Sequence, residues 1–157
     1  MLITRLVVSD LRVIENLVLE PSAGVNLIVG ANGTGKTSIL EAIYLAGRGR
    51  SFRHVSAGPM IRRGAESTMV RVHLCGGVNE LPKILGLRRG KRTFDCRLDG
   101  TDVQKRSTLA EALPVQWIGS QPQNFLERGP ELRRRFFDMG LFHVEHSYLK
   151  TYAELNR

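Results

Sequence analysis

An eight-residue glycine-rich segment, residues 30–37 with the sequence GANGTGKT, is the feature that most constrains this chain. It fits the phosphate-binding loop pattern G-x-x-x-x-G-K-[ST] at every fixed position. The apolar residues 25–29 precede it and predict a buried strand, while residues 38–45 follow it and predict a buried helix. Strand, glycine loop and helix together favour binding of a nucleoside triphosphate, because glycines let backbone N–H groups turn toward a phosphate.

The residues of this motif have separate expected roles. Lys36 reaches the β- and γ-phosphates, and the Thr37 hydroxyl can ligate Mg²⁺. ATP and Mg²⁺ are therefore the expected cofactors. The predicted nucleotide-binding set is Gly30, Ala31, Asn32, Gly33, Thr34, Gly35, Lys36, Thr37 and Ser38.

Charge points to a polyanionic partner. The 157 residues contain 23 Lys and Arg against 15 Asp and Glu, a net charge of +8. Such a balance favours nucleic acid or phosphates as ligands. Apolar runs are too short to span a membrane, and Cys75 and Cys96 are too isolated to indicate a zinc site or a disulfide framework. We therefore expect a cytoplasmic protein.

The remaining patterns predict an α/β fold of the P-loop NTPase type. We expect three parts: residues 1–66 with a strand pair and the phosphate-loop strand and helix, an antiparallel β block over residues 67–104, and a return strand with the start of a helical region over residues 105–157. The expected strands are 2–9, 17–19, 69–74, 83–87, 94–98 and 114–118, with a hairpin turn at Asp99-Gly100. The expected helices are 107–113 with Ser107 as N-cap, one opened by Pro130, and one over 148–155.

A hydrolytic site of this class also needs an apolar strand that ends in an Mg²⁺-binding Asp. Three segments resemble such a strand superficially, and they end at Asp10, Glu20 and Asp138. None fits: the first is interrupted by Ser9, the second ends in Glu and precedes the phosphate loop, and the third lies on a predicted helix. The sequence also contains no L-S-G-G-Q-like signature, so we expect this chain to be inactive as an ATPase on its own.

Several segments together resemble one family. They are residues 9–16, 30–44, 47–53 with Ser-Phe-Arg, 98–102, and 128–138 with Gly-Pro-x-x-Arg-Arg. The chain is similar to the N-terminal part of RecF, the bacterial recombination and repair ATPases, which are relatives of SMC proteins with an ABC-type head. The resemblance implies the N-terminal lobe of such a head. Family members are more than twice as long, with the signature and second acidic motifs in their C-terminal half.

The resemblance also implies a function in DNA replication and recombinational repair. Family members bind ATP and Mg²⁺, form ATP-dependent homodimers, bind DNA at gaps and junctions, and act with RecR-like and RecA-like proteins in RecA loading and the SOS response. The resemblance further implies that Arg12 lies near the nucleotide. One departure is at Gln121, in the loop where ABC proteins place their glutamine and where the family often has Pro-Glu. A Gln amide there can sense Mg²⁺ or the attacking water, as a Glu can, and Gln116 and Gln123 are alternative positions for this role.

Basic residues outside the loop are candidate DNA contacts. They are Arg88, Arg89, Lys91 and Arg92 on a predicted turn, and Arg50 and Arg53 after the phosphate-loop helix; the latter pair could also serve the nucleotide or an interface. A metal site at His143 and His146 is disfavoured, because no third ligand is in view. Two alternatives stay open: a small P-loop kinase, and a nucleotide-gated binding module without hydrolysis.

Overall fold

A computed structural model describes residues 1–54, 56–76, 81–119, 129–145 and 148–155. The chain divides into two compact units, residues 1–116 and residues 117–157. The first unit holds a β-sheet with two helices, and the second holds two further helices.

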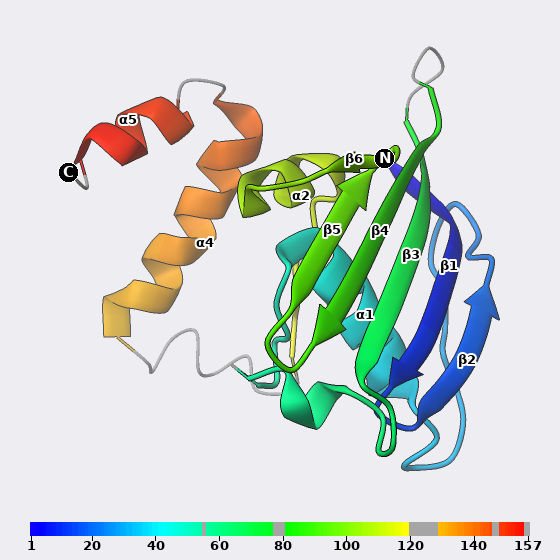
Figure 1. Cartoon of the computed structure of the whole chain (residues 1–157). Helices are drawn as coiled ribbons and strands as arrows, with labels where there is room; N and C mark the ends of the chain where they lie inside the picture. The colour runs from blue at the N-terminus through cyan, green and yellow to red at the C-terminus, as the bar shows by residue number, and fades with distance from the viewer. Residues whose placement is uncertain (55, 77–80, 120–128, 146–147, 156–157) are drawn as a thin grey trace. The chain divides into compact units, whose positions relative to one another are not determined.

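The sheet of the first unit has six strands in the order β2-β1-β3-β4-β5-β6, and every neighbouring pair is antiparallel (Figure 1). The pairing of β1 with β3 joins the N-terminal strand pair and the later β block into one sheet. The expected strands 2–9, 17–19, 69–74, 83–87 and 94–98 are confirmed within this sheet. Its strands are β1 (Leu2–Leu11), β2 (Ile14–Leu19), β3 (Ser67–Cys75), β4 (Lys83–Gly90), β5 (Phe94–Leu98) and β6 (Thr101–Asp102).

One face of the sheet forms the core. Alternate side chains of β1, β3 and β4 point to this face and are buried, as the two-residue period of a strand requires. The helix α1 (Lys36–Arg48) covers it with Ala42, Leu45 and Ala46, all fully buried (Figure 1). The helix α2 (Arg106–Ala112) contacts α1 and adds Leu109. The face of the phosphate-loop helix that meets the sheet is therefore buried, as its sequence predicts, whereas Leu40 is 39% exposed.

Turn chemistry explains how these elements end. Asp99 and Gly100 have positive φ values of 51° and 81° and connect β5 to β6, so the predicted hairpin turn is confirmed. Gly49 ends α1 in the left-handed conformation, and its N–H donates to the Leu45 carbonyl. The predicted cap at Ser107 is wrong. Lys105 is the N-cap of α2, because its backbone is extended and Ser107 already lies inside the first turn.

Two predicted strands do not form. Residues 25–29 and 114–118 have no strand assignment. Val25, Leu27 and Val29 are 97%, 85% and 76% exposed instead of buried. The physical reason is that a strand exists only when a neighbour satisfies its backbone groups, and no described residue of this chain pairs with either segment. An apolar sequence indicates that a segment can be a buried strand, but it does not supply the partner.

The second unit contains α4 (Gly129–Val144) and α5 (Tyr148–Leu155). Pro130 lies in the first turn of α4, as predicted, since that position needs no backbone donor. A short 3₁₀ turn, η1 (Gly58–Met60), belongs to the first unit and precedes β3. None of the helices in the described ranges combines the length and apolar character that crossing a membrane requires.

Candidate nucleotide-binding site

The glycine-rich loop has the backbone that its sequence predicts. Gly30, Gly33 and Gly35 have φ values of 152°, 85° and 100°, a region that other residues rarely adopt. Gly35 is also restricted by space, because an added Cβ would lie 3.2 Å from Val13 Cγ2 and 3.3 Å from Ile14 Cγ1. The loop therefore needs glycine for conformation, and at Gly35 a side chain would also be crowded by Val13 and Ile14.

The N-terminus of α1 opens directly from this loop. Gly35 is its N-cap and provides no side-chain acceptor, while the first turn contains no acidic residue. The N–H groups of Ser38 and Ile39 donate to the Gly35 carbonyl at 2.9 and 3.0 Å. An uncapped helix N-terminus with a positive dipole and free of acids suits an anion. The donor set therefore fits the phosphates of a nucleotide.

Lys36 lies across the loop. Its ammonium donates to the Gly30 carbonyl at 2.7 Å and to the Ala31 carbonyl at 2.6 Å. The Thr34 hydroxyl also donates to the Ala31 carbonyl, at 2.9 Å. Thr37, the candidate Mg²⁺ ligand, is exposed at the start of α1. The Lys36 ammonium therefore lies over the start of the loop, and an accessible hydroxyl lies in the first turn of α1.

Glu41 is a site residue that the sequence motif does not identify. It lies on α1 with its side chain fully buried. Arg12 binds its carboxylate in two places, with Nε 2.5 Å from Oε2 and Nη2 2.8 Å from Oε1. The Ser51 hydroxyl donates to Oε1, and Arg53 Nη1 lies 3.9 Å from Oε2. A single acid within a helix predicted to be buried was the only sequence signal for this cluster.

The ionisation of Glu41 follows from these partners. Burial raises the pKa of this carboxyl, but hydrogen bonds from Arg12 and Ser51 and the charges of Arg12 and Arg53 outweigh burial, and the pKa lies below its usual value. Glu41 is therefore a carboxylate at neutral pH.

The structure places Arg12 beside the phosphate-loop helix. Its φ of 54° lies in the left-handed region, which is costly for arginine. The turn is held by hydrogen bonds from Arg12 N to the Met60 carbonyl, 2.9 Å, and from Arg62 N to the Asp10 carbonyl, 2.8 Å. A third guanidinium bond runs from Arg12 Nη1 to the Pro59 carbonyl at 2.9 Å. Arg12 therefore links three segments of the first unit.

The other predicted site residues are distributed differently. Arg53 belongs to the Glu41 cluster, with a side chain 41% exposed, and Arg50 is exposed just after α1. Gln121 and His146 lie outside the described residues, as does the side chain of His143. Within the described residues, no three His, Cys, Asp or Glu side chains are grouped so as to hold a metal ion.

The predicted DNA-contact run does not form one surface. Arg88 lines the outer face of the sheet, where its Nε donates to the Ser67 hydroxyl at 3.0 Å. Arg89 points to the opposite side, with its guanidinium carbon 5.3 Å from the centre of the Phe94 ring. Lys91 and Arg92 are exposed in the turn between β4 and β5. Successive residues alternate between the faces of a strand, which separates neighbouring charges.

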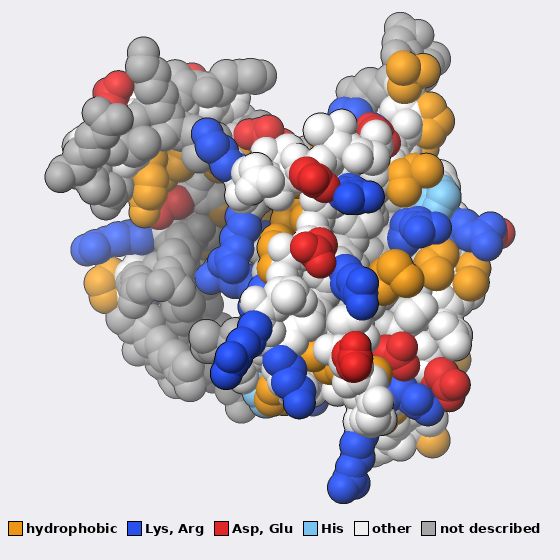
Figure 2. Space-filling view, in the orientation of Figure 1, with side chains coloured by type: hydrophobic (Ala, Val, Ile, Leu, Met, Phe, Trp, Pro, Cys, Tyr) orange, Lys and Arg blue, Asp and Glu red, His pale blue; other side chains and the backbone are white. Residues whose placement is uncertain are grey.

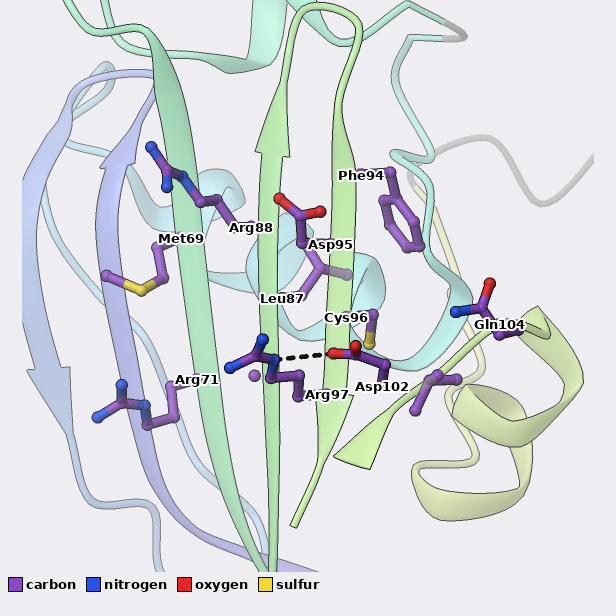
Figure 3. Close-up of a pocket in the computed structure, with 12 residues that line it drawn as sticks. Met69, Arg71, Leu87, Arg88, Phe94, Asp95, Cys96, Arg97, Asp102 and Gln104 are labelled. Carbon is purple, nitrogen blue, oxygen red and sulfur yellow. Dashed lines mark hydrogen bonds and ion pairs between the residues drawn. The ribbon is translucent and has the colours of Figure 1, made fainter. Parts of the chain in front are cut away.

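A groove of about 500 Å³ crosses the outer face of the sheet over β3, β4 and β5, and Arg71, Gly86, Arg88 and Arg97 are among its lining residues (Figure 3). Basic and acidic side chains alternate over this face (Figure 2). Arg97 is paired with Asp102 at 2.8 Å. The groove is therefore mixed in charge, unlike the phosphate loop, whose one charged side chain is that of Lys36.

Comparison with known proteins agrees with this fold. Residues 5–121 match the model of a family described as AAA domain. The chain belongs to this family of P-loop proteins. The match includes the phosphate loop, the Glu41 cluster and the sheet except for the first three residues of β1.

Individual relatives are more specific. Over its whole length the chain is 42% identical to the DNA replication and repair proteins RecF of Enterobacter sp. (strain 638) and Salmonella paratyphi A (strain ATCC 9150 / SARB42). It spans 44% of the length of these relatives. Two solved structures of the recombination mediator protein RecF in the RecFOR pathway, RecF-ATP and RecF-ATPrS, share the fold. Their TM-scores are 0.85 and 0.82 at 22% identity, with 99% of this chain covered and 43% and 42% of theirs. The particular protein that this chain resembles is RecF, as its sequence motifs indicate.

Proposed function

We propose that this chain binds ATP with Mg²⁺ and contributes the phosphate-binding lobe of a RecF-type protein of DNA replication and recombinational repair. The observation that carries the proposal is the phosphate loop. Its three glycines with positive φ, the uncapped N-terminus of α1 and Lys36 over the loop carbonyls form one anion-binding arrangement. Similarity to RecF proteins over the whole chain supports the biological setting.

Residue roles follow from this arrangement. The loop backbone and Ser38 surround the phosphates, Lys36 moves from the Gly30 and Ala31 carbonyls to phosphate oxygens, and Thr37 ligates Mg²⁺. An anionic phosphate is a stronger partner for an ammonium group than a neutral carbonyl, because the hydrogen bond then joins two opposite charges. We also retain Gln121 as a proposed sensor of Mg²⁺ or water.

The proposal also covers the binding partners and the cellular location of the longer protein. In the longer protein we propose an ATP-dependent homodimer that binds DNA at gaps and single-strand–double-strand junctions in the cytoplasm, with RecR-like and RecA-like proteins as partners in RecA loading and the SOS response. The net charge of +8 supports a polyanionic ligand. Arg50, Arg53, Arg88, Arg89, Lys91 and Arg92 are the proposed DNA contacts.

The nucleotide is tested first. We expect Lys36→Ala to lose one to two decades of affinity for a fluorescent ATP analogue in the presence of Mg²⁺, because a charged hydrogen bond contributes about 1.5–3 kcal/mol. Lys105→Ala removes the same charge from an exposed residue at the start of α2, outside the proposed binding residues, and is the matched control. Equal affinities for wild type and Lys36→Ala would refute the assignment.

A further inference from the structure

Glu41 has a feature that stability alone does not explain. In the described part of the chain it is the only charged side chain that is completely buried. A buried ion pair is an expensive way to fill a core, since a well-packed apolar residue of similar volume stabilises at least as much. The position of Glu41 on the phosphate-loop helix therefore calls for a role in the site.

The carboxylate joins three segments that are distant in sequence. Arg12 comes from the β1–β2 turn and binds Glu41 through two nitrogens. Ser51 comes from the segment after α1, and its hydroxyl donates to Glu41 while it accepts the N–H groups of Arg53 and His54 at 2.9 and 3.2 Å. One side chain of α1 thus fixes both neighbouring segments.

The β1–β2 turn lies at the phosphate end of α1, and residues 51–54 lie beside its middle turns, where Phe52 also packs on Tyr44. Glu41 follows Thr37 by four residues, so the two side chains lie on the same face of the helix, one turn apart. The side chains of Val13 and Ile14, which follow Arg12, pack where a Cβ of Gly35 would lie. The Glu41 cluster is therefore continuous with the loop through direct contacts.

The cluster also retains positive charge. Arg12 and Arg53 share one carboxylate, which leaves an excess of one positive charge among these three side chains. The side chain of Arg12 is 15% exposed and that of Arg53 is 41% exposed. A partly desolvated cationic cluster on the Thr37 face favours the terminal phosphates of a nucleotide.

We propose that Glu41 is a positioning residue of the nucleotide site, which acts through Arg12 to hold the β1–β2 turn beside the start of α1 and through Ser51 and Arg53 to hold residues 51–54 one turn further along the helix. The inference rests on the proposed ATP binding and assigns to it a residue outside the loop motif. Glu41 itself does not touch the nucleotide.

The direction in which Glu41→Gln changes the ATP affinity distinguishes a positioning role of Glu41 from a purely electrostatic one. Removal of a negative charge near phosphates would by itself strengthen binding of an anion. Loss of the two-point contact with Arg12 would weaken it, because an amide offers only one acceptor oxygen. We expect Glu41→Gln to bind a fluorescent ATP analogue about tenfold more weakly, with a smaller loss for the ADP analogue because the cluster lies on the Thr37 face.

Two variants complete the design. Arg12→Lys keeps the charge but cannot form the two-point contact, so we expect a similar loss, and the double variant Glu41→Gln/Arg12→Lys should lose little more. Glu15→Gln removes a carboxylate from the exposed pair with Arg62 and is the matched control, with unchanged affinity. Thermal unfolding is measured for each variant so that every titration uses folded protein. If Glu41→Gln does not fold, Ser51→Ala tests the same cluster by removing only the hydrogen bond from Ser51 to Glu41. We then expect a smaller loss of ATP affinity, because the two bonds from Arg12 remain.

The outcomes are distinct. Absence of ATP binding by the wild-type chain would overturn the proposed function, and this inference with it. Wild-type binding together with unchanged or stronger ATP binding by folded Glu41→Gln would overturn the inference alone. Equal losses for the ATP and ADP analogues, or an equal loss in Glu15→Gln, would also overturn it, since either result indicates a general structural effect.

Discussion

Gly47 in α1 offers a direct test of how tightly the phosphate-loop helix is packed. A Cβ added at Gly47 would lie 2.5 Å from the Leu113 carbonyl oxygen and 2.7 Å from Val115 Cγ2. The first of these atoms belongs to the backbone and cannot rotate away. Gly47→Ala therefore requires the helix and residues 113–115 to move apart.

Two effects of opposite sign decide the magnitude. Alanine improves helix propensity over glycine by about 1 kcal/mol. Overpacking a close contact costs about 1–3 kcal/mol, and a backbone atom at this distance favours the upper part of that range. The cost of overpacking exceeds the gain in helix propensity. We therefore expect Gly47→Ala to destabilise the chain by about 1–2 kcal/mol, which lowers Tm by about 2–8 °C for a chain of this size.

Thermal unfolding followed by circular dichroism measures the effect. Gly86→Ala is the matched control, because a Cβ at Gly86 in β4 meets no atom within 4 Å. Glycine weakens a strand interior, so we expect this control to be neutral or slightly stabilising. A Tm for Gly47→Ala equal to or above that of wild type would refute the packing argument, and equal decreases in both variants would refute its dependence on the neighbouring segment.

Two further predictions concern DNA binding and ATP hydrolysis. Replacing Arg88, Arg89, Lys91 and Arg92 with Ser should flatten the slope of log K for duplex DNA against log salt by up to about 3, because each neutralised phosphate contributes about 0.9 and Arg88 and Arg89 lie on opposite faces of the sheet. An unchanged slope would show that this run does not contact phosphates. The 157-residue chain alone should release no more phosphate from ATP than buffer does. Hydrolysis needs an oriented water and charge stabilisation, and the phosphate loop supplies neither. Turnover that depends on Lys36 would instead favour a compact P-loop enzyme such as a kinase.

The sequence identified the features that depend on local chemistry. Glycines with positive φ, the lysine after them and the helix that follows are encoded within a few residues, so the phosphate loop is recognisable before any folding is considered. The two-residue period of β3, β4 and β5 and the Asp99-Gly100 turn likewise identified the antiparallel strands. In these segments each residue's preference agrees with its final environment.

Tertiary structure decided what depends on partners. Residues 25–29 have the composition of a buried strand but remain exposed, because no described residue pairs with them. Arg88 and Arg89 are adjacent in sequence yet lie on opposite faces of the sheet. Glu41 gave almost no sequence signal, because its role comes from Arg12 and Ser51, which are 29 and 10 residues away in the chain. Sequence determines the conformation that a segment prefers, whereas burial and ion pairing depend on which distant segments the fold brings to it.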